Sequence, residues 1–331
     1  MTGRVSTLGG ALCLVTGGAG YIGHSLTRDL LAAGARVRRL FRATGRRPWL
    51  ARPNVEDVAG DITERADLER AAADVDVVFH LAGQTSVYVA DKDPVRDFAA
   101  NVQPLIDLAE LCLARNPSPR LVFSGTSTVT GVTLSVPVDP ARRDAPVTVY
   151  DVHKLMAEQY LEFCARVRGL SATTLRLCNV FGPGPPSGSS DRGILNQMIR
   201  RALNGEALTV YGEGNQLRDY AYVEDVARAF TAAAEAPASA VAGEHFVIGT
   251  GRGHTVREAV LRVAALVGAR LGNQVAVATV APPPGLSPIE NRFFVADPAP
   301  FERATGFRPL VTLDDGIART LDHLLSQEKS K

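Results

Sequence analysis

A glycine-rich turn near the start of the chain restricts the possible fold more than any other feature. Residues 12–23 read LCLVTGGAGYIG, an apolar run followed by Gly17, Gly18, Gly20 and Gly23. Glycine lets the backbone approach a pyrophosphate closely, and the first turn of a helix offers unpaired N–H groups to an anion. Alone such a turn is a weak signal, and it becomes a strong one where it joins the first strand of a β-α-β unit to its helix.

The first half of the chain provides that context. Apolar runs predict buried strands at residues 11–16, 37–41, 75–80 and 121–124, and helices are expected at 22–33, 67–73 and 94–115. Strands and helices that alternate in this way favour an α/β fold, a parallel, doubly wound sheet of the Rossmann type.

A change of composition after residue 179 predicts a second lobe. Residues 181–193, FGPGPPSGSSDRG, are too rich in Pro, Gly and Ser for regular structure, and an apparent helix, ILNQMIRRALNG, follows at once. We therefore expect a nucleotide-binding domain over residues 1–178, with a returning segment near 220–250, and a smaller substrate-binding lobe formed mainly by residues 179–331. A disordered linker is the alternative interpretation of the Pro-rich run.

Composition narrows the choice of partner and compartment. The chain has 331 residues, a formal net charge of +1 and 46% hydrophobic residues, so nothing indicates binding to nucleic acid or to an acidic membrane surface, and a small molecule is the expected partner. The four cysteines are widely spaced without a C-x-x-C pair, which indicates buried thiols in the cytoplasm and no metal site. The apolar residues 8–16 are too short to span a bilayer.

Tyr150 and Lys154 form a candidate acid/base pair. Lys154 is one of only four lysines in a chain that otherwise uses Arg, and a spacing of four residues places both side chains on one face of a helix. An adjacent ammonium brings a phenol with an ordinary pKa of about 10 closer to neutral pH, where it can donate or accept a proton. A surface Tyr and Lys of no special function would have the same spacing, so other segments must decide.

Taken in order along the chain, the motifs resemble those of the extended short-chain dehydrogenase/reductase family, which includes nucleotide-sugar epimerases, dehydratases and reductases. The resemblance covers nearly the whole chain: TGGAGYIG, GDI at 60–62, HLAG at 80–83, Asn101, FSGTSTVTG at 123–131, YDVHK, RLCNVFGPG, LTVYGEGNQLRDYAYVEDVA and HFVIGTG.

The resemblance implies a role for each matching residue. It implies Thr126, Tyr150 and Lys154 as the catalytic residues, with Tyr150 as acid/base and Lys154 also holding the nicotinamide ribose. Thr126 could otherwise be an ordinary turn hydroxyl, and Asp61 could instead cap the following helix. The residues implied to bind the cofactor, besides Tyr150 and Lys154, are Gly17, Gly20, Tyr21, Ile22, Gly23, Arg42, Asp61, Ile62, Leu81, Ala82 and Asn101.

The end of the second strand bears on the choice of cofactor. A dinucleotide fold that prefers NAD usually carries Asp or Glu there for the ribose 2′-OH, whereas a nearby Arg can accommodate a 2′-phosphate. Here Phe41 stands at the expected acidic position and Arg42 follows it, with Arg46 and Arg47 nearby. These arginines could also be surface residues of an Arg-rich chain. The missing acid favours NADP(H), with NAD(H) as the alternative.

The resemblance also implies residues for the substrate. Asn179, Arg218 and Arg292 are expected to contact the nucleotide diphosphate, since an Arg suits a phosphate. Asp225 is expected to cap a helix that begins at Val226. His24, His80 and His153 match no catalytic role and are interpreted as structural.

Two reactions stay open at this point. Ser127 and Thr128 replace the acidic residues that follow the catalytic Thr in family dehydratases and decarboxylases, which leaves oxidation or reduction at a sugar carbonyl. Thr126, Thr130 and the Phe41-Arg42 pair favour an NADPH-dependent 4-ketoreductase acting on an NDP-4-keto-6-deoxyhexose, as in deoxysugar biosynthesis. A 4-epimerase with retained NAD is the alternative, and Thr128-Val129 resembles the epimerase pattern. A non-catalytic NADP-binding sensor is disfavoured by the intact Tyr–Lys pair.

Apolar stripes on two predicted helices indicate a homodimer. The helices are those at about 94–115 and 150–168, and packing on the sheet accounts for part of each stripe. The stripe residues are Phe98, Val102, Leu105, Ala109 and Cys112 on the first and Val152, Leu155, Met156, Gln159, Tyr160 and Phe163 on the second.

Overall fold

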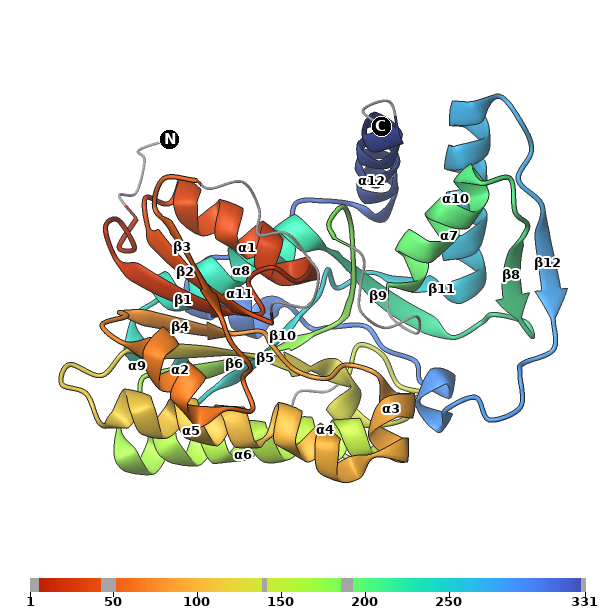
Figure 1. Cartoon of the computed structure of the whole chain (residues 1–331). Helices are drawn as coiled ribbons and strands as arrows, with labels where there is room; N and C mark the ends of the chain where they lie inside the picture. The colour runs from red at the N-terminus through yellow and green to blue at the C-terminus, as the bar shows by residue number, and fades with distance from the viewer. Residues whose placement is uncertain (1–5, 43–51, 139–141, 186–192, 329–331) are drawn as a thin grey trace.

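A computed structural model describes residues 6–42, 52–138, 142–185 and 193–328. Its centre is a parallel sheet of seven strands in the order β10-β6-β5-β4-β1-β2-β3 (Figure 1). The predicted α/β fold with a doubly wound parallel sheet is therefore confirmed. The strands are β1 (Leu12–Thr16), β2 (Arg36–Phe41), β3 (Val55–Ala59), β4 (Val77–His80), β5 (Arg120–Thr126), β6 (Ala172–Leu177) and β10 (His245–Ile248).

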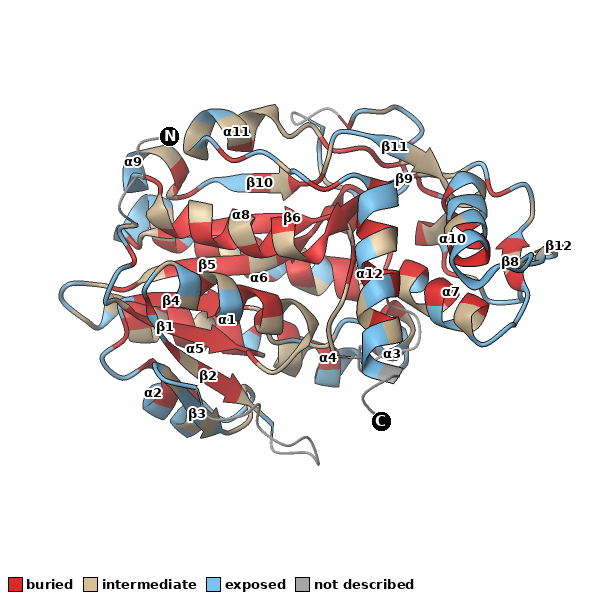
Figure 2. Ribbon diagram, turned by 90° about the horizontal axis from the view of Figure 1, so that it is seen from above, coloured by how far each residue is buried: buried red, intermediate tan, exposed pale blue. Residues whose placement is uncertain are grey.

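Helices cover both faces of this sheet. On one face lie α1 (Tyr21–Ala32), α8 (Val223–Glu235), α9 (Ala238–Val241) and α11 (Ala299–Thr305), and on the other α2 (Arg65–Ala72), α4 (Pro94–Asn101), α5 (Gln103–Leu113) and α6 (Val149–Arg168) (Figure 1). Each face has its own apolar core, one containing Leu26 and Phe230, the other Leu105 and Leu161. Figure 2 shows the buried residues concentrated along these central strands and the inner faces of the helices.

The second lobe has two small sheets. One contains β7 (Asn179–Phe181), β9 (Leu217–Tyr222) and β11 (Gly253–Thr255), and the other contains β8 (Leu208–Tyr211) and β12 (Val277–Val280). They pack with α7 (Ile194–Leu203), α10 (Val256–Leu271) and α12 (Leu313–Glu328) around a separate core. The chain returns from the second lobe to the main sheet: β9 lies in the lobe, and β10, the next strand in sequence, lies at the edge of the main sheet. No helix in the described ranges is both long and apolar enough to cross a bilayer.

Several expectations about local structure need correction. The helix predicted over 94–115 is two helices, α4 and α5, with Pro104 in the first turn of the second. Helix α8 begins at Val223, so Asp225 lies in its first turn and does not cap a helix starting at Val226. The buried Asp225 carboxylate instead accepts hydrogen bonds of 2.9 Å from the N–H groups of Leu310 and Val311, which anchors the C-terminal segment.

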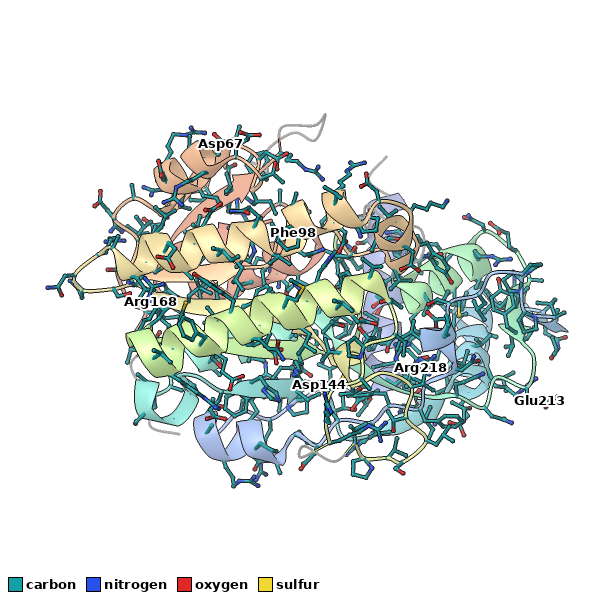
Figure 3. The ribbon with its side chains drawn as sticks, turned by 90° about the horizontal axis from the view of Figure 1, so that it is seen from below. Asp67, Phe98, Asp144, Arg168, Glu213 and Arg218 are labelled. Carbon is teal, nitrogen blue, oxygen red and sulfur yellow. The ribbon has the colours of Figure 1, made fainter. Side chains whose placement is uncertain are left out.

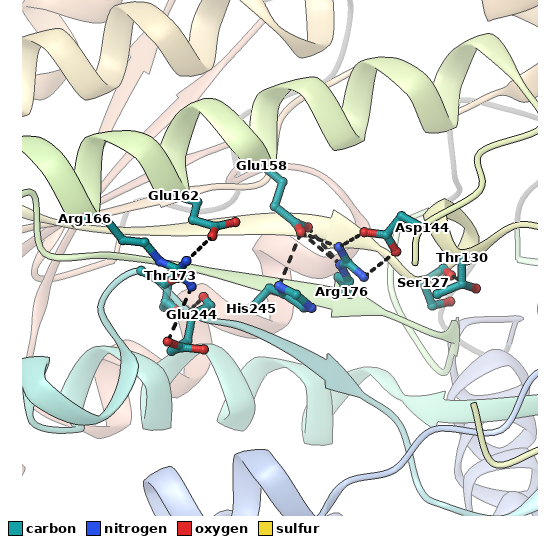
Figure 4. Close-up of polar contacts among 11 residues, drawn as sticks. Ser127, Thr130, Asp144, Glu158, Glu162, Arg166, Thr173, Arg176, Glu244 and His245 are labelled. Carbon is teal, nitrogen blue, oxygen red and sulfur yellow. Dashed lines mark hydrogen bonds and ion pairs between the residues drawn. The ribbon is translucent and has the colours of Figure 1, made fainter. Parts of the chain in front are cut away.

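A buried ion pair fastens α6 to the sheet. The guanidinium of Arg176, on β6, donates to both carboxylate oxygens of Glu158 on α6, with Nε–O distances of 3.0 and 3.1 Å. The same guanidinium donates to Asp144 at 2.9 and 2.7 Å, and His245 Nδ1 lies 3.6 Å from Glu158 (Figure 4). Arg176 and Glu158 are almost fully buried, so this pair holds α6 at a fixed position over β6.

We expect Arg176→Met to lower the free energy of unfolding by about 3 kcal/mol or more, because it leaves the Glu158 carboxylate buried without its cation. Urea unfolding followed by circular dichroism measures the change. The double variant Arg176→Met/Glu158→Leu should recover most of the loss, since only the carboxylate of Asp144, which reaches solvent, is then left without its cation. Equal destabilisation of the single and double variants would contradict the assigned role.

Candidate active site

The glycine turn at the start of α1 has the geometry of an anion cradle. Gly17 has φ of +68° and donates its N–H to the Leu40 carbonyl at 2.8 Å, and a Cβ on Gly23 would lie 2.3 Å from the Gly17 oxygen. Helix α1 has Gly20 as its N-cap, without a side-chain hydrogen bond to cap the first turn. The first N–H groups of the helix are therefore available to a ligand, and the turn fits a dinucleotide pyrophosphate.

Tyr21 and Ile22, in the first turn of α1, can offer only backbone groups to such a ligand, because their side chains are directed elsewhere. The Tyr21 side chain reaches away to the second lobe, where its hydroxyl donates to the Gly182 carbonyl at 2.8 Å and accepts from Asn196 at 3.1 Å. Burial raises the pKa of Tyr21 well above its ordinary value. The side chain of Ile22 packs against the apolar core.

An arginine that sequence reasoning did not single out supports the turn from below. Arg39, on β2, is buried and forms two hydrogen bonds with Asp57 on β3, at 2.6 and 2.7 Å. A Cβ on Gly18 would lie 2.7 Å from the Arg39 side chain. Sequence patterns did not reveal Arg39, because it is one of three arginines in this strand and nothing in the sequence shows which of them is buried or what it pairs with.

The end of β2 carries the residues predicted to choose the cofactor. Phe41 is the last residue of the strand and is partly buried, and Arg42 is exposed. Arg46 and Arg47 lie outside the described residues. No acidic residue follows Phe41 within the described part of this strand and its exit, residues 36–42.

Asp61 follows β3 and closes a turn. Its Oδ1 accepts hydrogen bonds of 3.0 Å from the N–H and the hydroxyl of Thr63, and its own N–H donates to Asp67 at 2.7 Å. The N-cap of α2 is Glu64, so the alternative in which Asp61 caps that helix is wrong. Ile62 packs against the core on the α2 face of the sheet.

Thr16 fixes the backbone at the end of β4. Its hydroxyl oxygen accepts from the N–H groups of Leu81 and Ala82, both at 3.1 Å, and lies 2.8 Å from His80 Nδ1. A Cβ on Gly17 would lie 3.1 Å from the Ala82 nitrogen, so this backbone borders the glycine turn. Burial and, less strongly, the charge of Lys154 lower the pKa of His80 to about 3, so His80 is a neutral residue of the core.

Asn101 belongs to a buried polar cluster with an acidic centre. The Asp97 carboxylate accepts from Gln84 at 2.6 Å and from Asn101 at 3.0 Å, and it lies 2.7 Å from His153 Nδ1. Asn101 Oδ1 is buried without a hydrogen-bond partner among the described residues, which makes it an acceptor available to a ligand. Asp97 and Gln84 stand close in sequence to the motif residues Asn101 and Gly83, but no pattern showed that the Asp97 carboxylate is buried against His153 of a different helix.

The three predicted catalytic residues lie on two adjacent elements. Thr126 ends β5, and α6 carries Tyr150 and Lys154 in its first and second turns. Tyr150 packs against Val87 on α3 (Val87–Lys92), and the Lys154 ammonium stands 4.1 Å above the centre of the Phe123 ring. Burial lowers the pKa of Lys154 to about 7, although the Asp97 and Glu158 carboxylates oppose the change.

The three predicted substrate residues come together in the second lobe. Arg292 donates to Asn179 Oδ1 at 3.3 Å, and the buried Arg218 donates to the backbone carbonyls of Arg292 and of Glu290, the latter at 2.8 Å. Arg218 therefore organises the loop that carries Arg292. Desolvation lowers the pKa of Arg218, which the Glu290 carboxylate partly offsets.

A search with protein-family models matches residues 13–249 to the NAD dependent epimerase/dehydratase family. Among curated proteins, the chain is 33% identical over 320 residues to a UDP-glucose 4-epimerase of Mycolicibacterium smegmatis, covering 93% of this chain and 97% of that protein.

Solved structures are also similar over nearly the full length. A Thermus thermophilus UDP-glucose 4-epimerase in complex with NAD is 32% identical, with a TM-score of 0.82, covering 95% of this chain and 99% of that one. A Thermotoga maritima UDP-glucose 4-epimerase with UDP-glucose is 29% identical, with a TM-score of 0.84, covering 96% and 99%.

The buried ammonium of Lys154 should give the protein a measurable dependence of stability on pH. Its folded pKa of about 7 lies below the ordinary value of 10.5, so between these pH values the unfolded chain binds more protons and stability rises with pH. Between pH 7 and 9 we expect wild type to gain on the order of 1–2 kcal/mol relative to Lys154→Met, measured by urea unfolding. Lys92→Met, which removes an exposed lysine, is the matched control and should parallel wild type. Parallel profiles for wild type and Lys154→Met would refute the expectation.

Proposed function

Because the chain belongs to the NAD-dependent epimerase/dehydratase family, we propose that it is a nucleotide-sugar 4-epimerase that oxidises and then reduces one sugar carbon. The family membership rests on a model match over residues 13–249 and on similarity to a 4-epimerase along nearly the whole chain. The identity of the sugar and the residues that act on it belong to the proposal.

The observation that carries the proposal is the position of the Tyr150–Lys154 pair. Both side chains are buried, and α6 brings them beside the end of β5, where Thr126 lies. Neighbouring parallel strands β1, β4 and β5 place the glycine turn, the Leu81–Ala82 backbone and Thr126 at the same edge of the sheet. Ligands bind at this edge in doubly wound folds.

These residues suit proton transfer to and from a sugar hydroxyl. In the proposal Tyr150 exchanges the proton of the reacting oxygen, and the Lys154 ammonium stabilises the phenolate form of Tyr150. Thr126 hydrogen-bonds the same oxygen and fixes its position. When bound, the nicotinamide cofactor supplies the hydride acceptor and donor.

Two features support the epimerase over the reductase that sequence analysis favoured. Thr128 and Val129 follow Thr126 in the epimerase pattern. Three of the relatives that align over nearly the full length carry the name UDP-glucose 4-epimerase. For the substrate, the Asn179–Arg292 contact and the loop held by Arg218 form a site suited to a nucleotide diphosphate.

The second candidate is an NADPH-dependent 4-ketoreductase acting on an NDP-4-keto-6-deoxyhexose. One observation favours it: Phe41 ends β2 where an acid would hold the 2′-OH of NAD, and the exposed Arg42 follows.

We also propose that the protein is a cytoplasmic homodimer. On α6 the side chains of Val152, Met156, Phe163 and Val167 are 41, 42, 49 and 69% exposed. They recur at helical spacing and form an apolar stripe that we call the α6 stripe. Figure 3 looks onto this face, where α6 runs beside α4 and α5. Leu105, Ala109 and Cys112 of the stripe predicted on the helix at about 94–115 are instead buried in the core.

The four cysteines bear on the proposed compartment. They are free buried thiols, which suits a reducing compartment.

The epimerase proposal predicts that purified protein retains NAD and converts UDP-glucose to UDP-galactose, detectable by anion-exchange chromatography of the nucleotides. Tyr150→Phe should lower kcat by at least about hundredfold and leave cofactor content unchanged, because it removes only the proton-exchanging oxygen. Tyr160→Phe is the matched control, since that phenol lies on the same helix and donates to Glu110. An empty site that binds NADPH more tightly than NADH, with reduction of a 4-keto sugar, would replace the epimerase by the second candidate.

The dimer proposal predicts that Phe163→Glu converts the protein to a monomer, because it places a charge in the centre of the α6 stripe. Light scattering coupled to size-exclusion chromatography gives the mass. Leu310→Glu is the control, since Leu310 is 73% exposed in a segment near the C-terminus, away from this stripe. A wild-type protein that is itself monomeric would exclude the proposed dimer.

A further inference from the structure

A chain of buried hydrogen bonds links Thr126 to a carboxylate on α6. Thr126 Oγ1 lies 2.7 Å from Thr128 Oγ1, and Thr128 Oγ1 donates to Asp151 Oδ1. Thr148 Oγ1 donates to the other carboxylate oxygen, Oδ2, at 2.7 Å. All four residues are buried, and Asp151 is 0% exposed.

The direction of each hydrogen bond from Thr126 to Asp151 can be assigned by counting hydroxyl protons. An ionised carboxylate only accepts hydrogen bonds, so the single hydroxyl proton of Thr128 is directed to Asp151. In the contact between the two threonine hydroxyls, Thr126 must then be the donor. Thr126 Oγ1 also accepts from the Thr128 N–H at 3.3 Å, which occupies one lone pair. The hydroxyl of Thr126 is left with one lone pair and no proton for a further partner.

Asp151 accepts hydrogen bonds at both carboxylate oxygens, and two features offset the cost of burying its charge. The residue lies in the first turn of α6, where the helix dipole stabilises a negative charge. Two hydroxyl groups donate to its two oxygens, one from Thr128 and one from Thr148. Hydrogen bonds to the charged form of a carboxyl group stabilise that form.

We propose that Asp151, acting through Thr128, is a positioning residue that presents Thr126 to the substrate as a hydrogen-bond acceptor. The site then binds a nucleotide sugar whose reacting oxygen is a hydroxyl in preference to the corresponding ketone, because a ketone oxygen has no proton to donate. While Tyr150 carries its proton, the hydroxyl donates to Thr126 and accepts from the Tyr150 phenol. Once Tyr150 is the phenolate, the hydroxyl turns its proton to Tyr150, and oxidation can proceed. This inference rests on the proposed function, since it takes Thr126 to face the reacting oxygen of a sugar.

The test compares two ligands that differ only at C4, UDP-6-deoxyglucose and UDP-4-keto-6-deoxyglucose, with UDP as the reference. Calorimetry gives the Kd of each in the Tyr150→Phe background, which prevents turnover. With Thr128→Val the proton of Thr126 is released towards the ligand, so the ratio of the ketone Kd to the hydroxyl Kd should fall about tenfold. Asp151→Asn should change the ratio in the same direction, because an amide can donate to Thr128.

Two controls separate this role from a structural one. Thr128→Ser keeps the hydroxyl and should preserve the ratio. Thr130→Val removes a buried hydroxyl in the same turn, one that donates to the Ser127 carbonyl at 2.9 Å and takes no part in the hydrogen bonds from Thr126 to Asp151. This variant should also preserve the ratio of the two Kd values. Thermal melts establish that each variant is folded, and the Kd of UDP should stay constant throughout.

The outcomes are distinct. A ratio unchanged within about twofold in both Thr128→Val and Asp151→Asn would overturn the inference while leaving the proposed function intact. If the protein with its native Thr128 and Asp151 binds neither sugar more tightly than UDP, the proposed function fails and the inference fails with it.

Discussion

The buried pairing of Arg176 with Glu158 is the interaction on which the candidate site depends. It ties α6 to β6 at a position one helical turn beyond Lys154, so the register of the whole helix on the sheet follows from it. Tyr150, Asp151 and Lys154 all lie on that helix. Because both partners are desolvated, neither can shift without exposing an unpaired charge to the protein interior.

The site concentrates buried charge around one ammonium. Lys154 is buried with its ammonium over the Phe123 ring, and the carboxylates of Asp97 and Glu158 lie near enough to counteract the effect of burial on its pKa. Asp151, the residue next to Tyr150, is held instead by the hydroxyls of Thr128 and Thr148. Carboxylates near the site thus have separate tasks, even on one helix: Glu158 counteracts the burial of a cation, and Asp151 organises hydroxyl protons.

Sequence patterns located the elements that carry the glycine turn, Thr126 and the Tyr150–Lys154 pair, because these features are local and periodic. They failed where the partner is distant. Asp225 was expected to cap a helix and instead binds the N–H groups of Leu310 and Val311. Strand β3 went unpredicted, since this edge strand has exposed residues at Glu56, Asp57 and Ala59 and no continuous apolar run. Arg39 and Asp97 showed no signal, because burial depends on packing that a single segment does not encode.

The sequence by itself determined the class of fold, the anion-binding turn and the helical spacing of the acid/base pair, because backbone freedom at glycine and the period of a helix are properties of short segments. Tertiary structure decided which polar groups share a partner. The direction of the Thr126 hydroxyl depends on a carboxylate 25 residues later in the chain, and it is fixed only when α6 packs beside the end of β5. Which hydroxyl donates and which accepts depends on contacts between segments that are distant in sequence, so only the folded structure decides it.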